Sequence, residues 1–413
     1  MTIGLFTLTS PLHNEEAVNA ASSAFIAEIE EALGMRFDFR GPDFSSYGSH
    51  DMELIYVRTG GTEGLFKDIY ENIQGPVRIL TSGRSNSLAA SMEILSYLNA
   101  QGRNGEIIHG SMEYIVSRIS VLANVSEALR RLDGTRLGII GEPSDWLISS
   151  EADRPAVARK TGVTLVDIPI ADLLAEYEKV SADVLDPLAE EVRSGLSSKA
   201  PSALNMYADG AFRIYKALKN LIDRHGLSGL SIRCFDLLDT IGNTGCLALA
   251  MLNAEGIPAG CEGDVPALLT MTIGNALAGV SGFQANPSRI DPQTGEILFA
   301  HCTVPLNMLS GYSFNTHFES GIGIAVCGEI PSGPATVFKV SGDLSRAFCC
   351  EAHLVRCQAE GGLCRTQAIL KVADPSVCTE YFLTNPIGNH HIIFPGACKT
   401  LFDAFLKEIQ SDR

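Results

Sequence analysis

The chain of 413 residues lacks a basic excess, a long apolar run and, over its first 233 positions, any cysteine. Its formal net charge of −17 and isoelectric point near 5.0 argue against nucleic acid or an anionic membrane as a partner. No run approaches the roughly 18 apolar residues of a membrane-spanning helix, so none is expected. The N-terminal segment has neither the basic start nor the apolar length of a signal peptide.

All eleven cysteines lie between Cys234 and Cys398. An odd number of cysteines without a secretion signal predicts reduced thiols and a cytoplasmic location. Four of them lie near His353 within residues 348–365, but their spacing contains no C-x-x-C pair, and the residue pattern of the segment is typical of β-strands. This favours buried core thiols over a zinc site.

Short apolar runs alternate with helical periodicity through the first two thirds of the chain. The run at 2–8 is a candidate buried strand, and the pattern at 13–34 predicts a helix that ends in glycine. The same unit recurs, and alternating strands and helices imply parallel sheets covered on both faces. From about residue 276 the pattern becomes β-rich, until a helical pattern returns at 396–410.

These patterns predict an α/β chain with a β-rich end. We expect a Rossmann-like domain over residues 1–110, a second over 111–275, and a β-rich domain with a terminal helix over 276–413. Both α/β domains would be doubly wound parallel sheets, and the third would be antiparallel and barrel-like. Ligands collect at the carboxyl ends of parallel strands, so the loop at 256–264, where the second domain meets the third, is the expected place of a site.

Three loop segments in the last part of the chain carry residue types that bind metals. They hold Glu262 with Asp264, then His301, then the pair His390 and His391. A carboxylate with two imidazoles suits a divalent ion such as Mn²⁺, Co²⁺ or Zn²⁺. No single spacing is diagnostic, and the plainer alternative is solvated carboxylates with histidines that bond to backbone carbonyls.

The order of these segments resembles the L-fucose/L-arabinose isomerase family. In that family an E-G-D loop ends the central domain, a Phe-led segment carries a second acid, an A-H loop follows, and a late H-H pair precedes the last helix. The counterparts here are Glu262-Gly263-Asp264, residues 282–291, Ala300-His301 and His390-His391. The resemblance extends to the expected architecture and covers most of the chain.

The resemblance implies a divalent-metal-dependent aldose–ketose isomerase, with Mn²⁺ or another cation such as Co²⁺, Zn²⁺ or Mg²⁺. The substrate would be a free or modified monosaccharide (a pentose, hexose, deoxy- or sulfo-sugar) that reacts through a cis-enediolate. By the same resemblance, Glu262 would be a ligand and an acid/base, His301 and His391 would be ligands, and His390 would contact the substrate. The family also implies a homo-oligomer, a trimer or hexamer, with active sites near subunit interfaces.

One departure from the family pattern concerns the second acid. Asn286 stands where the family has a ligand that also moves protons. An amide oxygen can coordinate a hard cation but cannot carry a proton. Three explanations stay open: a neighbour such as Asp291, Asp264 or Asp236 takes the second role, the match is displaced by a few residues, or the activity differs from plain isomerisation.

Further residues near strand ends are candidates for holding the sugar. Trp146, the sole tryptophan, could offer a stacking face, and Arg84 and Arg289 could bind a negatively charged substituent. The plainer alternatives are packing for the tryptophan, solvation for the arginines and a helix N-cap for Asp236.

The preferred function is the isomerase, with Glu262, Asn286, His301 and His391 as its metal ligands. Two other functions stay open beside it. A non-catalytic sugar-binding or regulatory relative, which kept the fold and lost proton transfer, would explain Asn286. A metal-dependent epimerase or lyase would share the enediolate intermediate.

Overall fold

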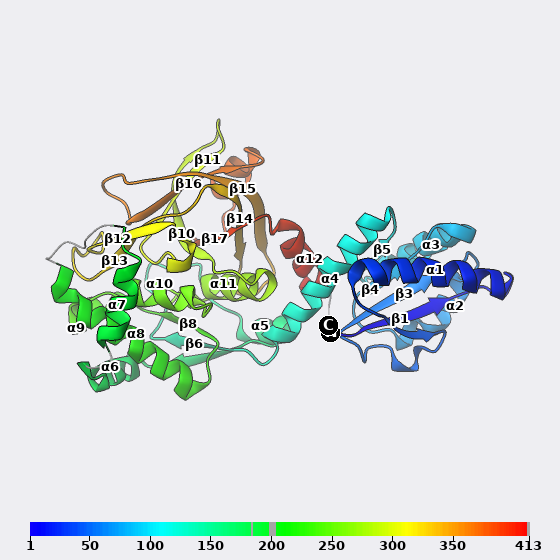
Figure 1. The fold of residues 1–413 in the computed structure, drawn as a ribbon, viewed down its shortest axis with the longest axis horizontal. Coiled ribbons are helices and arrows are strands. Elements are labelled where there is room, and N and C mark those ends of the chain that lie inside the picture. The colour runs from blue at the N-terminus through cyan, green and yellow to red at the C-terminus, as the bar shows by residue number, and fades with distance from the viewer. Residues whose placement is uncertain (183–184, 198–203, 411–413) are drawn as a thin grey trace. The chain divides into compact units, whose positions relative to one another are not determined.

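The computed structural model describes residues 1–182, 185–197 and 204–410. The chain forms two compact units (Figure 1). The first comprises Met1–Arg130 with the C-terminal segment from Asp403, and the second comprises Arg131–Phe402. Within the described residues, no helix combines the length and apolar character that crossing a membrane requires.

The first unit is built on one sheet of five parallel strands in the order β2-β1-β3-β4-β5. Its strands are β1 (Ile3–Leu8), β2 (Asp38–Gly41), β3 (Met52–Val57), β4 (Val77–Leu80) and β5 (Gly105–Ile108). Its helices are α1 (Glu15–Leu33), α2 (Glu63–Ile69), α3 (Ser87–Ala100), most of α4 (Met112–Leu132) and most of α12 (Lys399–Gln410).

Helices cover both faces of this sheet. Neighbouring residues of a strand point to opposite faces, and in β1 they belong to two separate cores. Leu5 packs in a cluster with Ile115 of α4, whereas Phe6 packs in another with Phe66 of α2 and Ile94 of α3. The expectation of a parallel sheet covered on both faces is confirmed for this unit.

The second unit begins with a parallel sheet in the order β7-β6-β8-β9. Its strands are β6 (Arg136–Ile140), β7 (Thr164–Ile168), β8 (Gly229–Ile232) and β9 (Ala259–Gly260). Its helices are α5 (Arg154–Thr161), α6 (Ile170–Lys179), α7 (Leu185–Ser194), α8 (Asn205–His225), α9 (Asp236–Ile241), α10 (Cys246–Ala254) and α11 (Val265–Ala278).

A closed antiparallel barrel follows, in the order β10-β11-β16-β15-β14-β17. Its strands are β10 (Phe283–Asp291), β11 (Glu296–His301), β14 (Gly333–Val340), β15 (Ala347–Gln358), β16 (Thr366–Val372) and β17 (His391–Pro395). β12 (Gly311–Asn315) and β13 (Ala325–Glu329) form a separate antiparallel pair. The prediction of a parallel α/β region followed by an antiparallel, barrel-like region is confirmed. The cysteine-rich segment that begins at Ala347 forms strand β15, as its residue pattern predicted.

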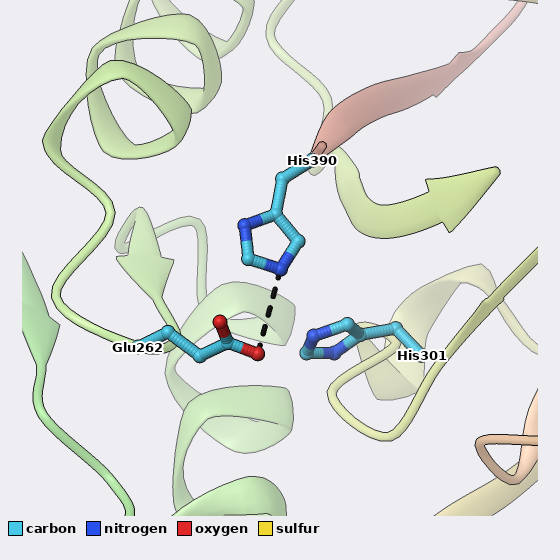
Figure 2. A group of neighbouring side chains, drawn as sticks. All are labelled: Glu262, His301 and His390. Carbon is cyan, nitrogen blue, oxygen red and sulfur yellow. Dashed lines mark ion pairs between the residues drawn. The ribbon is translucent and has the colours of Figure 1, made fainter. Parts of the chain in front are cut away.

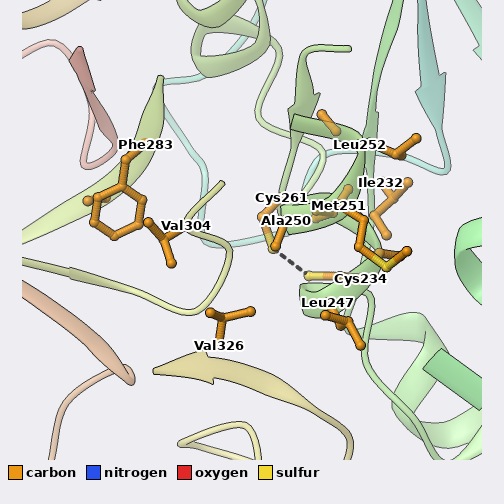
Figure 3. Packing of buried hydrophobic residues seen from close by; sticks show 14 of the residues in the cluster. Ile232, Cys234, Leu247, Ala250, Met251, Leu252, Cys261, Phe283, Val304 and Val326 are labelled. Carbon is orange, nitrogen blue, oxygen red and sulfur yellow. Dashed lines mark hydrogen bonds between the residues drawn. The ribbon is translucent and has the colours of Figure 1, made fainter. Parts of the chain in front are cut away.

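One hydrophobic core joins the second sheet to the barrel (Figure 3). Ile232 at the end of β8 and Leu252 of α10 belong to the same buried cluster as Phe283 of β10 and Val326 of β13. The second α/β region and the β-rich region therefore share one compact unit. Loops at the carboxyl edge of the sheet are held beside the open ends of barrel strands, and this is where the site lies.

Candidate metal centre

Glu262 lies in the tight loop between β9 and α11. Asp264 ends this loop as the N-cap of α11, and its Oδ1 accepts a hydrogen bond of 2.8 Å from the Ala267 amide. Glu262 (φ 64°) and Gly263 (φ 69°) both adopt the left-handed backbone conformation. A Cβ on Gly263 would lie 2.7 Å from the carbonyl oxygen of Glu142, so a glycine is required there.

Two histidines reach the same place from the barrel. His301 is the last residue of β11, and His390 immediately precedes β17. Nδ1 of His301 is 2.9 Å from Oγ1 of Thr303, and Nδ1 of His390 is 2.8 Å from Oδ2 of Asp264. Because each Nδ1 is engaged, each ring has its Nε2 left as a ligand atom, as in oriented metal-binding imidazoles.

Glu262, His301 and His390 converge in a buried group (Figure 2). One ligand atom from each lies within 4.8 Å of the other two, and Nε2 of His390 is 3.6 Å from Oε1 of Glu262. That Nε2 has no hydrogen-bond partner among the residues that the structure describes. A buried polar atom without a partner costs free energy, which coordination to a cation would offset. The donor set fits a divalent first-row ion.

The pKa values of this group are strongly shifted. Burial raises the pKa of Glu262, but the nearby His390 with its charge, the charge of His301 and the Trp146 N–H together lower it to about 2. Burial lowers the pKa of His390, yet the carboxylates of Asp264 and Glu262 raise it to about 9. Burial and the charge of His390 lower the pKa of His301 to about 4. The two carboxylates thus draw positive charge to this point, as a cation site requires.

Asp264 and Lys339 are both fully buried next to His390. Nζ of Lys339 is 3.7 Å from Oδ2 of Asp264. Burial raises the pKa of Asp264, but the charge of Lys339 and the contacts with His390 and Ala267 hold it well below its usual range. Both carboxylate oxygens have partners within the protein, and Asp264 thereby orients the ring of His390. The expectation that Asp264 is a catalytic acid stays a prediction.

His391 faces away from the group and into an aromatic pocket. Its Nε2 accepts a hydrogen bond of 2.8 Å from the Tyr381 hydroxyl, and its ring packs against Phe348 and Phe382. Burial lowers its pKa to about 3. The structure therefore brings His390, and not His391, to Glu262 and His301, whereas the resemblance implied His391 as the ligand.

Asp236 lies outside the group, and Asn286 lies on a strand that pairs with the one carrying His301. Asn286 is half-buried on β10, where it pairs with Ala300, the residue before His301. Asp236 is the first residue of α9, and its Oδ1 accepts a hydrogen bond of 3.0 Å from Nε of Arg233. Asp236 supplies no ligand atom to the three-residue group, and the expectation that Asn286 is a metal ligand stays a prediction.

Of the three residues expected to hold the sugar, one contacts the group. Trp146 donates a hydrogen bond of 2.6 Å from Nε1 to Oε2 of Glu262. Arg289 forms a surface ion pair with Glu360, with an N–O distance of 2.8 Å. Arg84 belongs to the first unit, where it is exposed in the turn that follows β4.

A cavity of about 1050 Å³ opens at the carboxyl ends of β6, β7 and β8. Among its lining residues are Arg233 and Asp236, together with Glu142 from the loop after β6 and Val265 at the start of α11. Glu142 touches Gly263, and Val265 follows Asp264 directly, so the cavity adjoins the loop that carries Glu262. Its volume exceeds what a monosaccharide needs.

Sequence reasoning missed Thr303 and Lys339. Thr303 follows His301 by two residues, and nothing in that spacing marks it as the partner of Nδ1. Lys339 carried a signal, because a lysine inside the apolar run of β14 is rarely buried without a charged partner.

No protein-family model matches the chain. Among curated proteins, it is 27% identical over 269 residues to the sulfoquinovose isomerase of Clostridium sp. (strain MSTE9), covering 62% of this chain and 59% of that protein. It is 23% identical over 224 residues to the sulfoquinovose isomerases of Priestia aryabhattai and Priestia megaterium, covering 53% of this chain and 50% of theirs. The chain thus spans between half and three fifths of the length of the curated relatives it matches.

These relatives are named as sugar isomerases, the class of enzyme that the motifs indicated. The narrower likeness to fucose and arabinose isomerases stays a prediction.

Proposed function

We propose that the chain is an aldose–ketose isomerase of a sulfo-sugar, dependent on a divalent cation held by Glu262, His301 and His390. The observation that carries the proposal is the buried convergence of these three side chains, with the unpartnered Nε2 of His390 among them. The named activity of the relatives supports the reaction class and the sulfonated substrate.

A cation bound there would supply Lewis-acid stabilisation of the negative charge that develops on the sugar oxygens. Glu262 is the sole acidic side chain of the group, so it is the proposed proton carrier. Its carboxylate takes the proton from C2 of the open-chain aldose, the C–H electron pair becomes the C1–C2 double bond of a cis-enediolate, and the proton returns to C1. Asp264 and Thr303 keep the two imidazoles oriented throughout.

The cavity beside the Glu262 loop is the proposed place for the rest of the sugar. Arg233 lines it, fixed through Nε by Asp236 and through Nη1 by the Pro143 carbonyl. Its Nη2 is paired at 3.2 Å with the exposed carboxylate of Asp145, which a sulfonate could displace. We assign Arg233 to the sulfonate and keep Asp236 as a candidate for the proton transfer between the sugar hydroxyls.

Further expectations from the sequence accompany this proposal. They are Mn²⁺ as the natural cation, Rossmann-like character for both parallel sheets, a homo-oligomer with sites near subunit interfaces, and a cytoplasmic location. Mn²⁺ agrees with a site of mixed nitrogen and oxygen donors.

A second candidate is a sugar-binding protein without turnover. One observation favours it: Glu262 is the single carboxylate of the three-residue group. Such a protein would gain thermal stability from the sugar without converting it.

The deciding experiment follows the C2 proton. The protein is stripped with chelator, restored with Mn²⁺ and incubated in D₂O with sulfoquinovose and a panel of unmodified aldoses, while NMR monitors C2–H. Metal-dependent exchange with ketose formation supports the isomerase. Exchange without ketose indicates an epimerase or lyase, and bound sulfoquinovose without exchange indicates the binding protein.

A further inference from the structure

The loop after β6 carries two large apolar side chains to the surface beside the metal centre. Trp146 is 53% exposed and Ile148 is 87% exposed. The two residues differ in one respect that matters: the Trp146 indole has a polar contact with the buried group, whereas the side chain of Ile148 has no polar atom.

Trp146 is tied to Glu262 through both side chain and main chain. Its Nε1 donates to Oε2 of Glu262 at 2.6 Å, and the amide of Ser144 in the same loop donates to the Glu262 carbonyl at 2.9 Å. The indole packs edge-on against Phe235, with 4.9 Å between ring centroids. The ring is therefore held in place by a neighbour that is not part of the metal centre.

The two oxygens of Glu262 consequently have different surroundings. Oε2 is bonded to Trp146, whereas Oε1 faces Nε2 of His390 at 3.6 Å. A carboxylate is planar, so fixing one oxygen sets the direction of the other. The left-handed backbone of Glu262 sets an unusual direction for its Cα–Cβ bond. The hydrogen bond from Trp146 fixes the carboxylate at the other end of the side chain.

We propose that Trp146 is a positioning residue of the metal centre, whose indole N–H holds Oε2 of Glu262 so that Oε1 alone is presented to the cation. This inference rests on the proposed metal site. It differs from the sugar-stacking role expected from the sequence, because it acts before any sugar binds. It also makes the chain's one tryptophan a reporter of cation binding.

Titration of the chelator-stripped full chain with Mn²⁺ tests the reporter. Tryptophan emission should change saturably, with the same midpoint as Mn²⁺ uptake followed independently by the EPR signal of free Mn²⁺. Mg²⁺, which is not paramagnetic, separates a rearrangement of the indole from simple quenching. Saturable uptake of Mn²⁺ by EPR with unchanged emission would overturn the inference and leave the proposed metal site intact.

Trp146→Phe tests the positioning itself. The variant keeps an aromatic ring against Phe235 and removes only the N–H donor, and we expect its affinity for Mn²⁺ to fall by about tenfold, as for other partners of metal ligands. Ile148→Ala in the same loop is the matched control and should bind Mn²⁺ as the native chain does. Melting of the metal-free proteins should show that both variants fold.

The outcomes separate this inference from the proposed function. Equal Mn²⁺ affinity in Trp146→Phe and the native chain contradicts the positioning role, even if the enzyme is a metal-dependent isomerase. Failure of the native chain to take up Mn²⁺ contradicts both. A tenfold loss of Mn²⁺ affinity without any sugar turnover by the native chain supports the positioning role and rejects the isomerase.

Discussion

At the scale of single residues, the site depends on which atoms are already occupied. His390 and His391 are neighbours in sequence, yet one presents a free Nε2 to Glu262 and the other bonds Tyr381. Asp264 has the residue type of an acid catalyst, but its oxygens serve His390 and the start of α11. Residue type alone does not assign a role, because the partners of each side-chain atom affect what it can bind.

Glu262→Gln should abolish metal binding and turnover together. The amide keeps the size of the side chain but loses the charge that attracts the cation and the base that takes the C2 proton. Metal content after gel filtration and the isomerase rate are the measurements. Glu360→Gln, on a surface carboxylate paired with Arg289, is the control and should retain both. Native metal content in Glu262→Gln would remove Glu262 from the site.

Substitution of His390 and of His391 should affect Mn²⁺ binding differently. His390→Gln is expected to weaken Mn²⁺ binding by at least tenfold, since it removes a ligand atom. His391→Gln should leave Mn²⁺ affinity within about twofold and lower the free energy of unfolding by about 1 kcal/mol, through loss of the Tyr381 hydrogen bond. Isothermal titration and urea unfolding measure the two quantities. The opposite pattern would restore His391 as the ligand.

At the scale of elements, the ends of helices and strands position the chemistry. α11 begins at Val265 behind the Asp264 cap, and this fixes the loop that carries Glu262. α6 and α8 are joined on the other side of the unit by Glu176, which bonds Lys179 and Arg224. Each contact can be tested through stability.

Asp264→Asn should destabilise the protein by about 3 kcal/mol, because it leaves the ammonium of Lys339 buried without a countercharge. The asparagine keeps a side-chain oxygen for the helix cap, so the lost stability comes mainly from removing the negative charge. Asp264→Asn combined with Lys339→Met should be more stable than Asp264→Asn alone, as measured by urea unfolding. Additive losses would show that the two charges do not interact.

Glu176 should make stability depend on pH in the acid range. The hydrogen bonds and charges of Lys179 and Arg224 lower its pKa from 4.5 to about 2. Because the folded-state pKa is depressed, the stabilisation is present above about pH 4.5 and is lost as the pH falls towards 2. At pH 7 the free energy of unfolding of the native chain should exceed that of Glu176→Gln by about 1 kcal/mol. This difference in the free energy of unfolding, measured by urea titration, should become smaller below pH 4.5. A difference that stays constant with pH would contradict the shifted pKa.

Elements with a clear period were predictable from sequence, and short ones were not. The apolar spacing at 13–34 indicated α1, observed over Glu15–Leu33, and the pattern at 396–410 indicated α12. β2, with three of its four residues exposed, and β9, with two residues, carry too few apolar positions to show a period. Their pairing comes from neighbouring strands that supply the hydrogen bonds.

At the scale of the whole molecule, the chain has separate cores in its two compact units. The clusters around Leu5 and Phe6 lie in the first unit, and the cluster that joins the second sheet to the barrel lies in the second. The candidate metal centre belongs wholly to the second unit, although its first and last residues, Glu262 and His390, are more than a hundred residues apart in the chain. A cation bound there would contact one unit only.

Calorimetry should show this selectivity. With free Mn²⁺ at 100 times its dissociation constant, the second unit should gain about 2.7 kcal/mol of stability, and the first unit should gain none. We expect two unfolding transitions in the metal-free chain, of which Mn²⁺ raises one. Glu262→Gln should lose this response, and a shift of both transitions would show that the units unfold together.

The sequence by itself determined the α/β-then-β architecture, the three segments that supply the site, and two of its side chains, Glu262 and His301. It could do so because apolar period and residue type are local properties. Only the tertiary structure brought His390 rather than His391 to Glu262, gave Asp264 its contact with His390 and placed Trp146 on Glu262. These depend on which face of a strand meets which loop, and that is set by contacts between residues far apart in the chain.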